Sequence, residues 1–151
     1  DVANHDRAWQ AQHFIPNDKL QTASKLLMCA YALAFTLPGV PCVYYGDEIC
    51  TQGYKDPFNR SFFDWSKTDC QTVGEIREMA NFRNNHSQYA GGKIFFVFLN
   101  DNAAAFVRFD ENGEVLTAVN RGIEPVEFNY KNRLYKIEKQ SYILEEVKDG
   151  E

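Results

Sequence analysis

The chain has 151 residues, 44% of them hydrophobic and 25% charged, which is the balance of a globular protein able to bury a sizeable core. Its formal net charge is −5, and no stretch gathers the Lys and Arg side chains that a phosphate backbone requires, so no binding to nucleic acid is expected. No apolar run reaches the roughly 20 residues of a membrane-spanning helix, so no membrane association is expected either.

Residues 18–35 are predicted to form a helix. Asn17 and Asp18 are candidate caps, and Gln21 follows Asp18 at the spacing of a capping box. Apolar residues then recur at helical spacing: Leu20, Ala23, Leu27, Ala30, Tyr31, Ala34 and Phe35. A Pro-Gly pair at 38–39 ends the helix.

Residues 40–45 are predicted to form a buried parallel strand, because the run "VPCVYY" is apolar on both faces. A long loop follows, and its many aromatic residues favour an ordered, functional loop over disorder. A second helix is predicted over residues 72–85, capped by Thr72 with Glu75 three residues later, and with Val73, Ile76, Met79, Ala80 and Phe82 facing inward. A helix that leads into a parallel strand is typical of α/β architecture.

The pattern changes after Gly91 and Gly92. Six short runs of alternating or β-branched residues follow, separated by turn residues such as Asn112-Gly113, Arg121-Gly122 and Lys131-Asn132. The pattern predicts a small antiparallel β-sandwich with hairpin connections. We therefore place a domain boundary near residues 89–93, which divides the chain into units at 1–90 and 91–151.

The four cysteines are Cys29, Cys42, Cys50 and Cys70. They form no C-x-x-C pair and lie at no zinc-finger spacing from a histidine, so no metal site is predicted, and no cofactor is expected. Cys29 and Cys42 lie in apolar runs, and buried free thiols are the interpretation we prefer. Free thiols favour a reducing, cytoplasmic compartment.

Three polar stretches are candidates for chemistry. Asn4-His5-Asp6 places an imidazole beside a carboxylate, although such a stretch is more often a plain loop. Asp47-Glu48 follows the predicted strand and is a candidate glycosidase carboxylate pair, but structural hydrogen bonds to the loop are the preferred interpretation. Asp56 and Arg60, four residues apart, suit either a clamp on sugar hydroxyls, with Tyr54 or Phe58 as an apolar face, or an internal salt bridge.

Taken together, these stretches resemble the α-amylase family of glycoside hydrolases. The resemblance rests on "NHD", then a helix, then "LPGVPCVYYGDEI", then "DPFNR", in this order. It is strongest toward the neopullulanase, cyclomaltodextrinase and maltogenic amylase members. It implies the end of a (β/α)₈ barrel over residues 1–90, followed by an antiparallel β-sandwich over residues 91–151.

The resemblance also implies roles for single residues. Asp6 would be the catalytic carboxylate that stabilises the transition state, and His5 would contact the sugar in subsite −1. Asp56 and Arg60 would bind the next glucose in subsite −2. The substrate of the intact enzyme would be an α-glucan, maltooligosaccharide or cyclodextrin with α-1,4 bonds, and α-1,6 bonds as an alternative. The nucleophile and the acid/base of this family lie in motifs that these 151 residues do not contain, so the chain alone is expected to be inactive.

A second interpretation is a non-catalytic β-sandwich module for assembly or glucan binding. Under either interpretation, helix stripes shaped to cover a closed barrel, and the unpaired edges of the strand at 40–45, would face water in this chain. Exposed apolar surface of this kind drives association, so the isolated chain is expected to self-associate, or its first half to dock on the sandwich in a non-native way.

Overall fold

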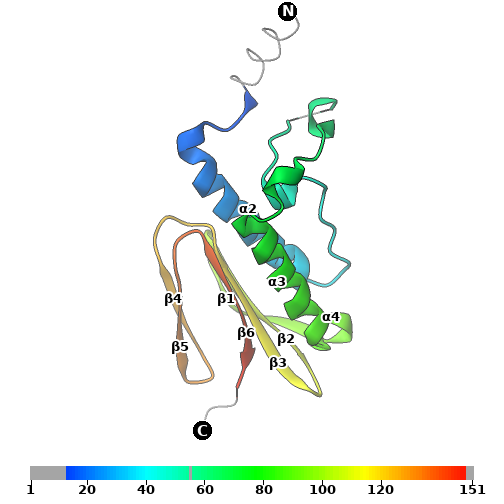
Figure 1. Ribbon diagram of the computed structural model, residues 1–151. Coiled ribbons are helices and arrows are strands. Elements are labelled where there is room, and N and C mark those ends of the chain that lie inside the picture. Colours follow the sequence, from blue (N-terminus) through cyan, green and yellow to red (C-terminus); the bar gives the residue numbers. More distant parts are fainter. Residues whose placement is uncertain (1–12, 55, 149–151) are drawn as a thin grey trace, which may run out of the picture.

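The computed structural model describes residues 13–54 and 56–148 (Figure 1). Helices fill the first part of this chain and strands the second. The α-helices are α2 (Leu20–Thr36), α3 (Gln71–Asn85) and the short α4 (Gln88–Gly91). Short 3-10 turns lie at Asn17–Lys19, Asp47–Ile49, Phe58–Arg60 and Trp65–Lys67. The strands are β1 (Lys93–Leu99), β2 (Ala103–Asp110), β3 (Gly113–Asn120), β4 (Val126–Tyr130), β5 (Arg133–Ile137) and β6 (Ser141–Val147).

Helix α2 confirms the first predicted helix, with a different start. A 3-10 turn at Asn17–Lys19 precedes it, and the cap residue Lys19 makes no side-chain capping bond, so the predicted cap at Asp18 is wrong. Its buried residues, three to four apart, include Met28, Ala32 and Phe35. None of the described helices is long and apolar enough to cross a bilayer.

The predicted strand at residues 40–45 is wrong. The segment is unpaired, and Val40 is 94% exposed, although Val43 contacts the α2 cluster. An apolar run of this kind becomes a strand only when neighbouring strands accept and donate its backbone hydrogen bonds. Among the described residues, no strand lies alongside it to do so.

Helix α3 confirms the second predicted helix, but its first turn is capped differently from the prediction. Its cap position is Cys70, and the Thr72 hydroxyl donates to the Glu48 carbonyl at 2.5 Å instead of capping its own helix. The predicted capping box at Thr72 is therefore wrong. This bond ties the start of α3 to the 3-10 turn at Asp47–Ile49. Met79 is buried between α3 and α2.

All six predicted strands are present. Four form an antiparallel sheet in the order β1-β2-β3-β6, and β4 pairs with β5 in a separate hairpin. The β2–β3 and β4–β5 connections are tight turns at the predicted places. Lys131 and Asn132 both have positive φ, as a two-residue hairpin turn with the right twist requires.

The connection after β3 is not a hairpin, contrary to the pattern at Arg121-Gly122. The chain leaves the four-stranded sheet, forms the β4–β5 hairpin, and returns as β6 beside β3. Buried Asn120 holds this crossing, because its amide donates to the carbonyls of Glu124 and Glu138 and its oxygen accepts from the Gly122 N–H. A buried amide with all these partners fixes one path for the chain.

The molecule therefore has three layers (Figure 1). Helices α2 and α3 cover one face of the four-stranded sheet, and the β4–β5 hairpin covers the other. The hairpin side is an apolar core of residues from β2, β3, β4 and β5, including Leu116 and Phe128. The helix side joins Met28 and Met79 to Val119 of β3. The structure agrees with the predicted fold class, α/β plus all-β with the end of a (β/α)₈ barrel followed by a small antiparallel β-sandwich, in its helices and its antiparallel sheets.

Candidate functional site

The candidate site is the loop between α2 and α3, together with Asn4-His5-Asp6. The latter stretch lies outside the described residues, so the structure gives no geometry for His5 or Asp6. The loop is described except for residue 55, and it carries Asp47, Glu48, Asp56 and Arg60.

Asp47 and Glu48 serve the architecture of the loop. The Tyr31 hydroxyl of α2 donates to Asp47 at 2.5 Å, and the Gly46 N–H donates to Glu48 at 2.7 Å. Burial, and then this bond to Asp47, raises the pKa of Tyr31 well above its usual value. These bonds support the structural interpretation: the carboxylates fasten the start of the loop to α2 and to itself.

Asp56 and Arg60 lie together on the surface. Arg60 Nε is 2.5 Å from Asp56 Oδ1, and both side chains are largely exposed, at 70% and 61%. Exposed ion pairs contribute little to stability, about 0 to 1 kcal/mol, so folding does not require this pair. Their charged groups face solvent, where a polyhydroxylated ligand can reach them.

Glycine and asparagine backbones hold the loop in shape. Gly46 has φ +97°, a left-handed value that favours glycine. A Cβ atom at Gly53 would lie 2.8 Å from Asn59 Cα, so only glycine lets the backbone at residue 53 pass this close to the backbone at residue 59. The Tyr44 and Tyr45 hydroxyls both donate to the Asn59 carbonyl at 3.5 Å.

A hollow of about 330 Å³ lies in the same loop, and one residue of its lining, Tyr44, interacts electrostatically with both Asp56 and Arg60. It is lined by Tyr44, Tyr45, Asp47, Thr51, Gly53, Tyr54 and Asn59. The Asn59 side-chain oxygen is buried and has no hydrogen-bond partner among residues 13–54 and 56–148. Tyrosine faces and amide oxygens are groups that suit a sugar ring and its hydroxyls. Sequence reasoning assigned Tyr44 and Tyr45 to a buried strand, so it missed this lining.

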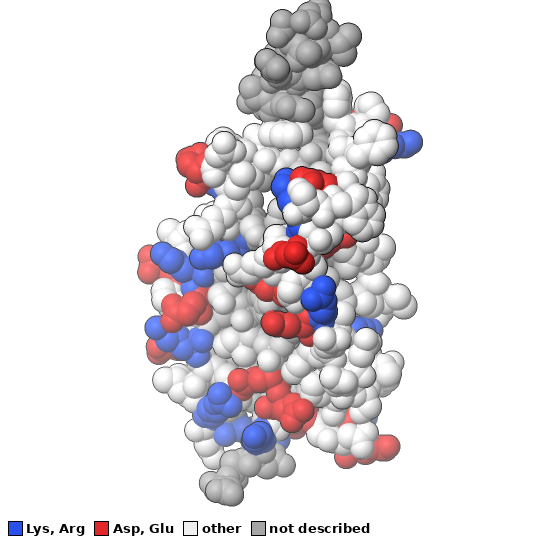
Figure 2. All heavy atoms as spheres, in the orientation of Figure 1, with Lys and Arg blue, Asp and Glu red and all other residues white. Residues whose placement is uncertain are grey.

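Charges are mixed over the molecule. Figure 2 shows acidic and basic side chains interspersed on the face in view, with no large field of one sign. Within residues 13–54 and 56–148, no three His, Cys, Asp or Glu side chains are grouped as metal ligands would be.

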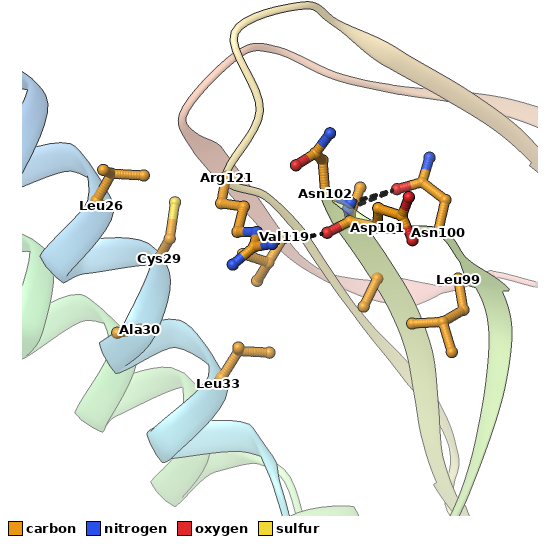
Figure 3. A pocket seen from close by; sticks show the side chains of 12 residues that line it. Leu26, Cys29, Ala30, Leu33, Leu99, Asn100, Asp101, Asn102, Val119 and Arg121 are labelled. Carbon is orange, nitrogen blue, oxygen red and sulfur yellow. Dashed lines mark hydrogen bonds between the residues drawn. The ribbon is translucent and has the colours of Figure 1, made fainter.

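A second, apolar groove lies away from the loop. Its volume is about 420 Å³, and α2 lines one side with Leu26, Cys29, Ala30 and Leu33. The β1–β2 turn and the end of β3 line the other side, where the Arg121 guanidinium donates to the Asp101 carbonyl (Figure 3). Leu99 at its rim is 69% exposed. This groove has few polar groups, so it suits an apolar partner better than a sugar.

Comparison with known proteins relates the chain to starch-degrading enzymes. No family model matches it. It is 35% identical over 92 residues to an amylopullulanase of Thermoanaerobacter thermohydrosulfuricus, a match that covers 61% of this chain and 6% of that protein. It is 30% identical over 105 residues to a cyclomaltodextrinase of Geobacillus thermopakistaniensis, covering 67% of this chain and 18% of that protein.

Solved structures agree. The chain superposes on the cyclic α-maltosyl-(1→6)-maltose hydrolase of Arthrobacter globiformis with a TM-score of 0.75 and 25% identity, over 82% of this chain and 30% of that one. The chain is thus similar to one portion of enzymes of the α-amylase family. The family relatives are glycoside hydrolases that act on starch, pullulan and cyclodextrins, and the chain spans only a small fraction of their length.

Proposed function

We propose that these residues belong to a retaining α-amylase-family hydrolase and supply part of its sugar-binding cleft. Residues 1–90 are the end of the (β/α)₈ barrel, and residues 91–151 are the β-sandwich domain that follows it. The substrate is an α-glucan, maltooligosaccharide or cyclodextrin with α-1,4 bonds, and α-1,6 bonds as a further class.

The exposed Asp56–Arg60 pair, in the same loop as a tyrosine-lined hollow, is the observation that supports this proposal. A carboxylate accepts hydrogen bonds from sugar hydroxyls and a guanidinium donates to them, so the two can hold the 2- and 3-hydroxyls of one glucose. Tyr54 lines the hollow, packs against the His13 ring and is 59% exposed, so part of its ring is accessible to a sugar. A glucan ligand is also supported by related structures, because the Arthrobacter globiformis hydrolase has been solved in complex with maltose and with cyclic α-maltosyl-(1→6)-maltose.

In this proposal Asp6 stabilises the positive charge that develops on the sugar in the transition state, and His5 hydrogen-bonds the same sugar. A retaining hydrolase also needs a nucleophile and an acid/base carboxylate about 5 to 5.5 Å apart. By the family pattern, neither lies in these 151 residues.

The first test is hydrolysis by the isolated chain. Purified chain incubated with maltooligosaccharides and with cyclodextrin should release no reducing ends. Turnover that persists through purification and disappears in Asp6→Ala would overturn the assignment.

The second test uses the proposed intact enzyme. Arg60→Ala should raise KM for maltooligosaccharides about tenfold with a smaller change in kcat, because it removes charged hydrogen bonds from a bound sugar that does not react. Arg77→Ala, which changes an exposed arginine of α3, is the matched control and should leave both constants unchanged. Equal effects of the two variants would remove Arg60 from the binding site.

The apolar groove favours a second candidate, in which the β-sandwich serves assembly rather than catalysis. Its exposed apolar rim is the supporting observation. A glucan-binding version of this candidate predicts that the chain is retarded in a starch-containing native gel, and unretarded migration would remove that version.

A further inference from the structure

Two cysteines from distant parts of the chain meet at the base of the loop. Cys50 Sγ lies 3.9 Å from the Thr72 hydroxyl oxygen, and Cys70 Sγ lies 3.2 Å from the same atom. The two sulfurs are therefore separated by no more than these two distances combined. Cys50 ends the 3-10 turn at Asp47–Ile49, and Cys70 is the cap residue of α3, so the pair brackets residues 51–69, the second part of the loop.

The surroundings hold both thiols in a polar niche. Cys50 Sγ donates to the Ser24 hydroxyl at 3.6 Å, and Cys70 Sγ donates to the Glu48 carbonyl at 3.6 Å. Both residues are half-buried and line an open hollow of about 620 Å³, so a small reagent has access to the sulfurs. A rotation of each side chain about its Cα–Cβ bond is the movement by which sulfurs so placed approach bonding distance.

The niche also favours the reactive form of one thiol. Burial by itself would raise the pKa of Cys70, but a hydrogen bond with the Thr72 side chain and hydrogen bonds from the backbone N–H groups of Val73 and Thr72 outweigh it, and the pKa is lowered. Thiolates, not thiols, attack peroxides. Cys29 is the contrast, because burial raises its pKa to about 11 and leaves it 3% exposed.

We propose that Cys50 and Cys70 are a redox-active pair, oxidised by a hydroperoxide to a disulfide that closes the loop between them. The Cys70 thiolate attacks one peroxide oxygen, the O–O bond breaks, and Cys70 becomes a sulfenic acid while the other oxygen leaves as water or an alcohol. The Cys50 thiolate then attacks the Cys70 sulfur, the S–S bond forms, and hydroxide leaves and is protonated to water. Two thiols are oxidised and one peroxide is reduced.

The product would be a ring of residues 50–70 that encloses Asp56 and Arg60. A disulfide lowers the conformational entropy of the unfolded chain, and in the folded chain it limits how far residues 51–69 can move. The disulfide would form whether or not the loop binds a sugar, since the two sulfurs and the hollow that exposes them are its requirements.

The test treats the full 151-residue chain, carrying Cys42→Ser to prevent bonds between molecules, with hydrogen peroxide. The expected product has lost two hydrogen atoms in mass, and digestion without reductant yields a peptide that joins Cys50 to Cys70. Thioredoxin or a dithiol should restore the starting mass. Cys29→Ser in the same background should form the same link to the same extent.

Cys50→Ser is the variant that isolates the mechanism. Cys70 should then stop at the sulfenic acid, which dimedone traps, and no internal link should form. Before oxidation, Cys70 should react with iodoacetamide at least about tenfold faster than Cys29 at neutral pH. The proposal is overturned if the chain with both thiols oxidises each sulfur separately without linking them, or if Cys29 links to either one.

Discussion

Arg108 is a guanidinium buried in the middle of β2, with 2% of its surface exposed. It donates to the Thr36 carbonyl at the end of α2 and to the Gly92 carbonyl ahead of β1. Its charge lies 5.7 Å from the centre of the Tyr89 ring. It therefore satisfies a carbonyl in the last turn of α2, where a positive charge is also favourable, and the carbonyl of the residue that follows α4.

Replacing Arg108 by Met should lower the free energy of unfolding by about 2 to 4 kcal/mol, because a buried carbonyl and a half-buried carbonyl lose their donors while the apolar stem is kept. Urea unfolding followed by circular dichroism measures this. Arg121→Met is the matched control. Arg121 is exposed, and among the described contacts its side chain donates only to the Asp101 carbonyl, so the loss should stay below about 1 kcal/mol. Similar losses in the two variants would contradict the account of Arg108.

For single residues, the sequence predicted which polar side chains form hydrogen bonds or ion pairs, but not always which partner each one has. The Asp56–Arg60 spacing suggested a pair, and the structure has that pair. Thr72 was expected to cap its own helix and instead bonds the Glu48 carbonyl, 24 residues away. Capping is a local preference, and a partner brought by the fold can outcompete it.

Two glycines, Gly91 at the end of α4 and Gly92 just before β1, lie at the junction of these elements, and the close packing there requires only Gly92. A side chain at Gly92 would meet the Gln88 carbonyl at 2.5 Å and the Phe109 carbonyl at 2.8 Å, whereas one at Gly91 would meet nothing within 4 Å. Only Gly92 therefore lets the end of α4 approach β2.

Gly92→Ala should lower the free energy of unfolding by about 1 to 3 kcal/mol, because backbone must shift to admit the methyl group. Gly91→Ala, its neighbour, should leave stability unchanged or raise it by up to about 1 kcal/mol, since Gly91 lies in a helical turn. Thermal unfolding of both variants gives the comparison. A destabilising Gly91→Ala with a neutral Gly92→Ala would show that the close approach has been misplaced.

Among the secondary-structure elements, the strands agreed best with the predictions made from the sequence. Alternation and turn residues act over a few neighbours, so all six strands and the turns at Asn112-Gly113 and Lys131-Asn132 were predictable. The run at 40–45 failed because a parallel strand depends on neighbours far away in sequence. The predicted burial of Cys42 was wrong for the same reason, since Cys42 is an exposed residue of this unpaired segment.

For the whole molecule, one buried and one partly buried titratable group predict a loss of stability at alkaline pH. Burial raises the pKa of Cys29 from 9.0 to about 11, and burial with a hydrogen bond to Glu114 raises that of Tyr130 from 10.0 to about 12. Both groups are neutral when protonated, so the folded state binds these protons more tightly than the unfolded state. Their contribution to stability is complete below about pH 9 and is lost as the pH rises toward 12.

Guanidinium unfolding at a series of pH values should show the free energy of unfolding falling between about pH 9 and pH 12. Cys29→Ala should flatten the lower part of this fall and Tyr130→Phe the upper part. A constant stability across the range would contradict the burial of these groups.

The exposed apolar edge predicts self-association of the isolated chain. Phe96 and Leu99 on edge strand β1 are 54% and 69% exposed, and Leu99 lines the groove against α2. A second copy of the chain would cover this surface. Light scattering at rising concentration should show a growing average mass, and Leu99→Lys should return it to that of a monomer.

Leu134→Lys is the control, because Leu134 is 58% exposed on β5 and lies outside the groove. It should leave the average mass unchanged. A monomeric parent chain at high concentration would contradict the prediction of self-association.

The sequence by itself determined the order and type of nearly all the elements, because helical periodicity, strand alternation and turn chemistry are set by residues a few positions apart. Only the tertiary structure decided that β6 returns beside β3, that Arg108 binds the end of α2, and that Cys50 and Cys70 share one hydroxyl. Each of these contacts joins residues that lie far apart in the chain, and their meeting depends on how whole layers pack against one another.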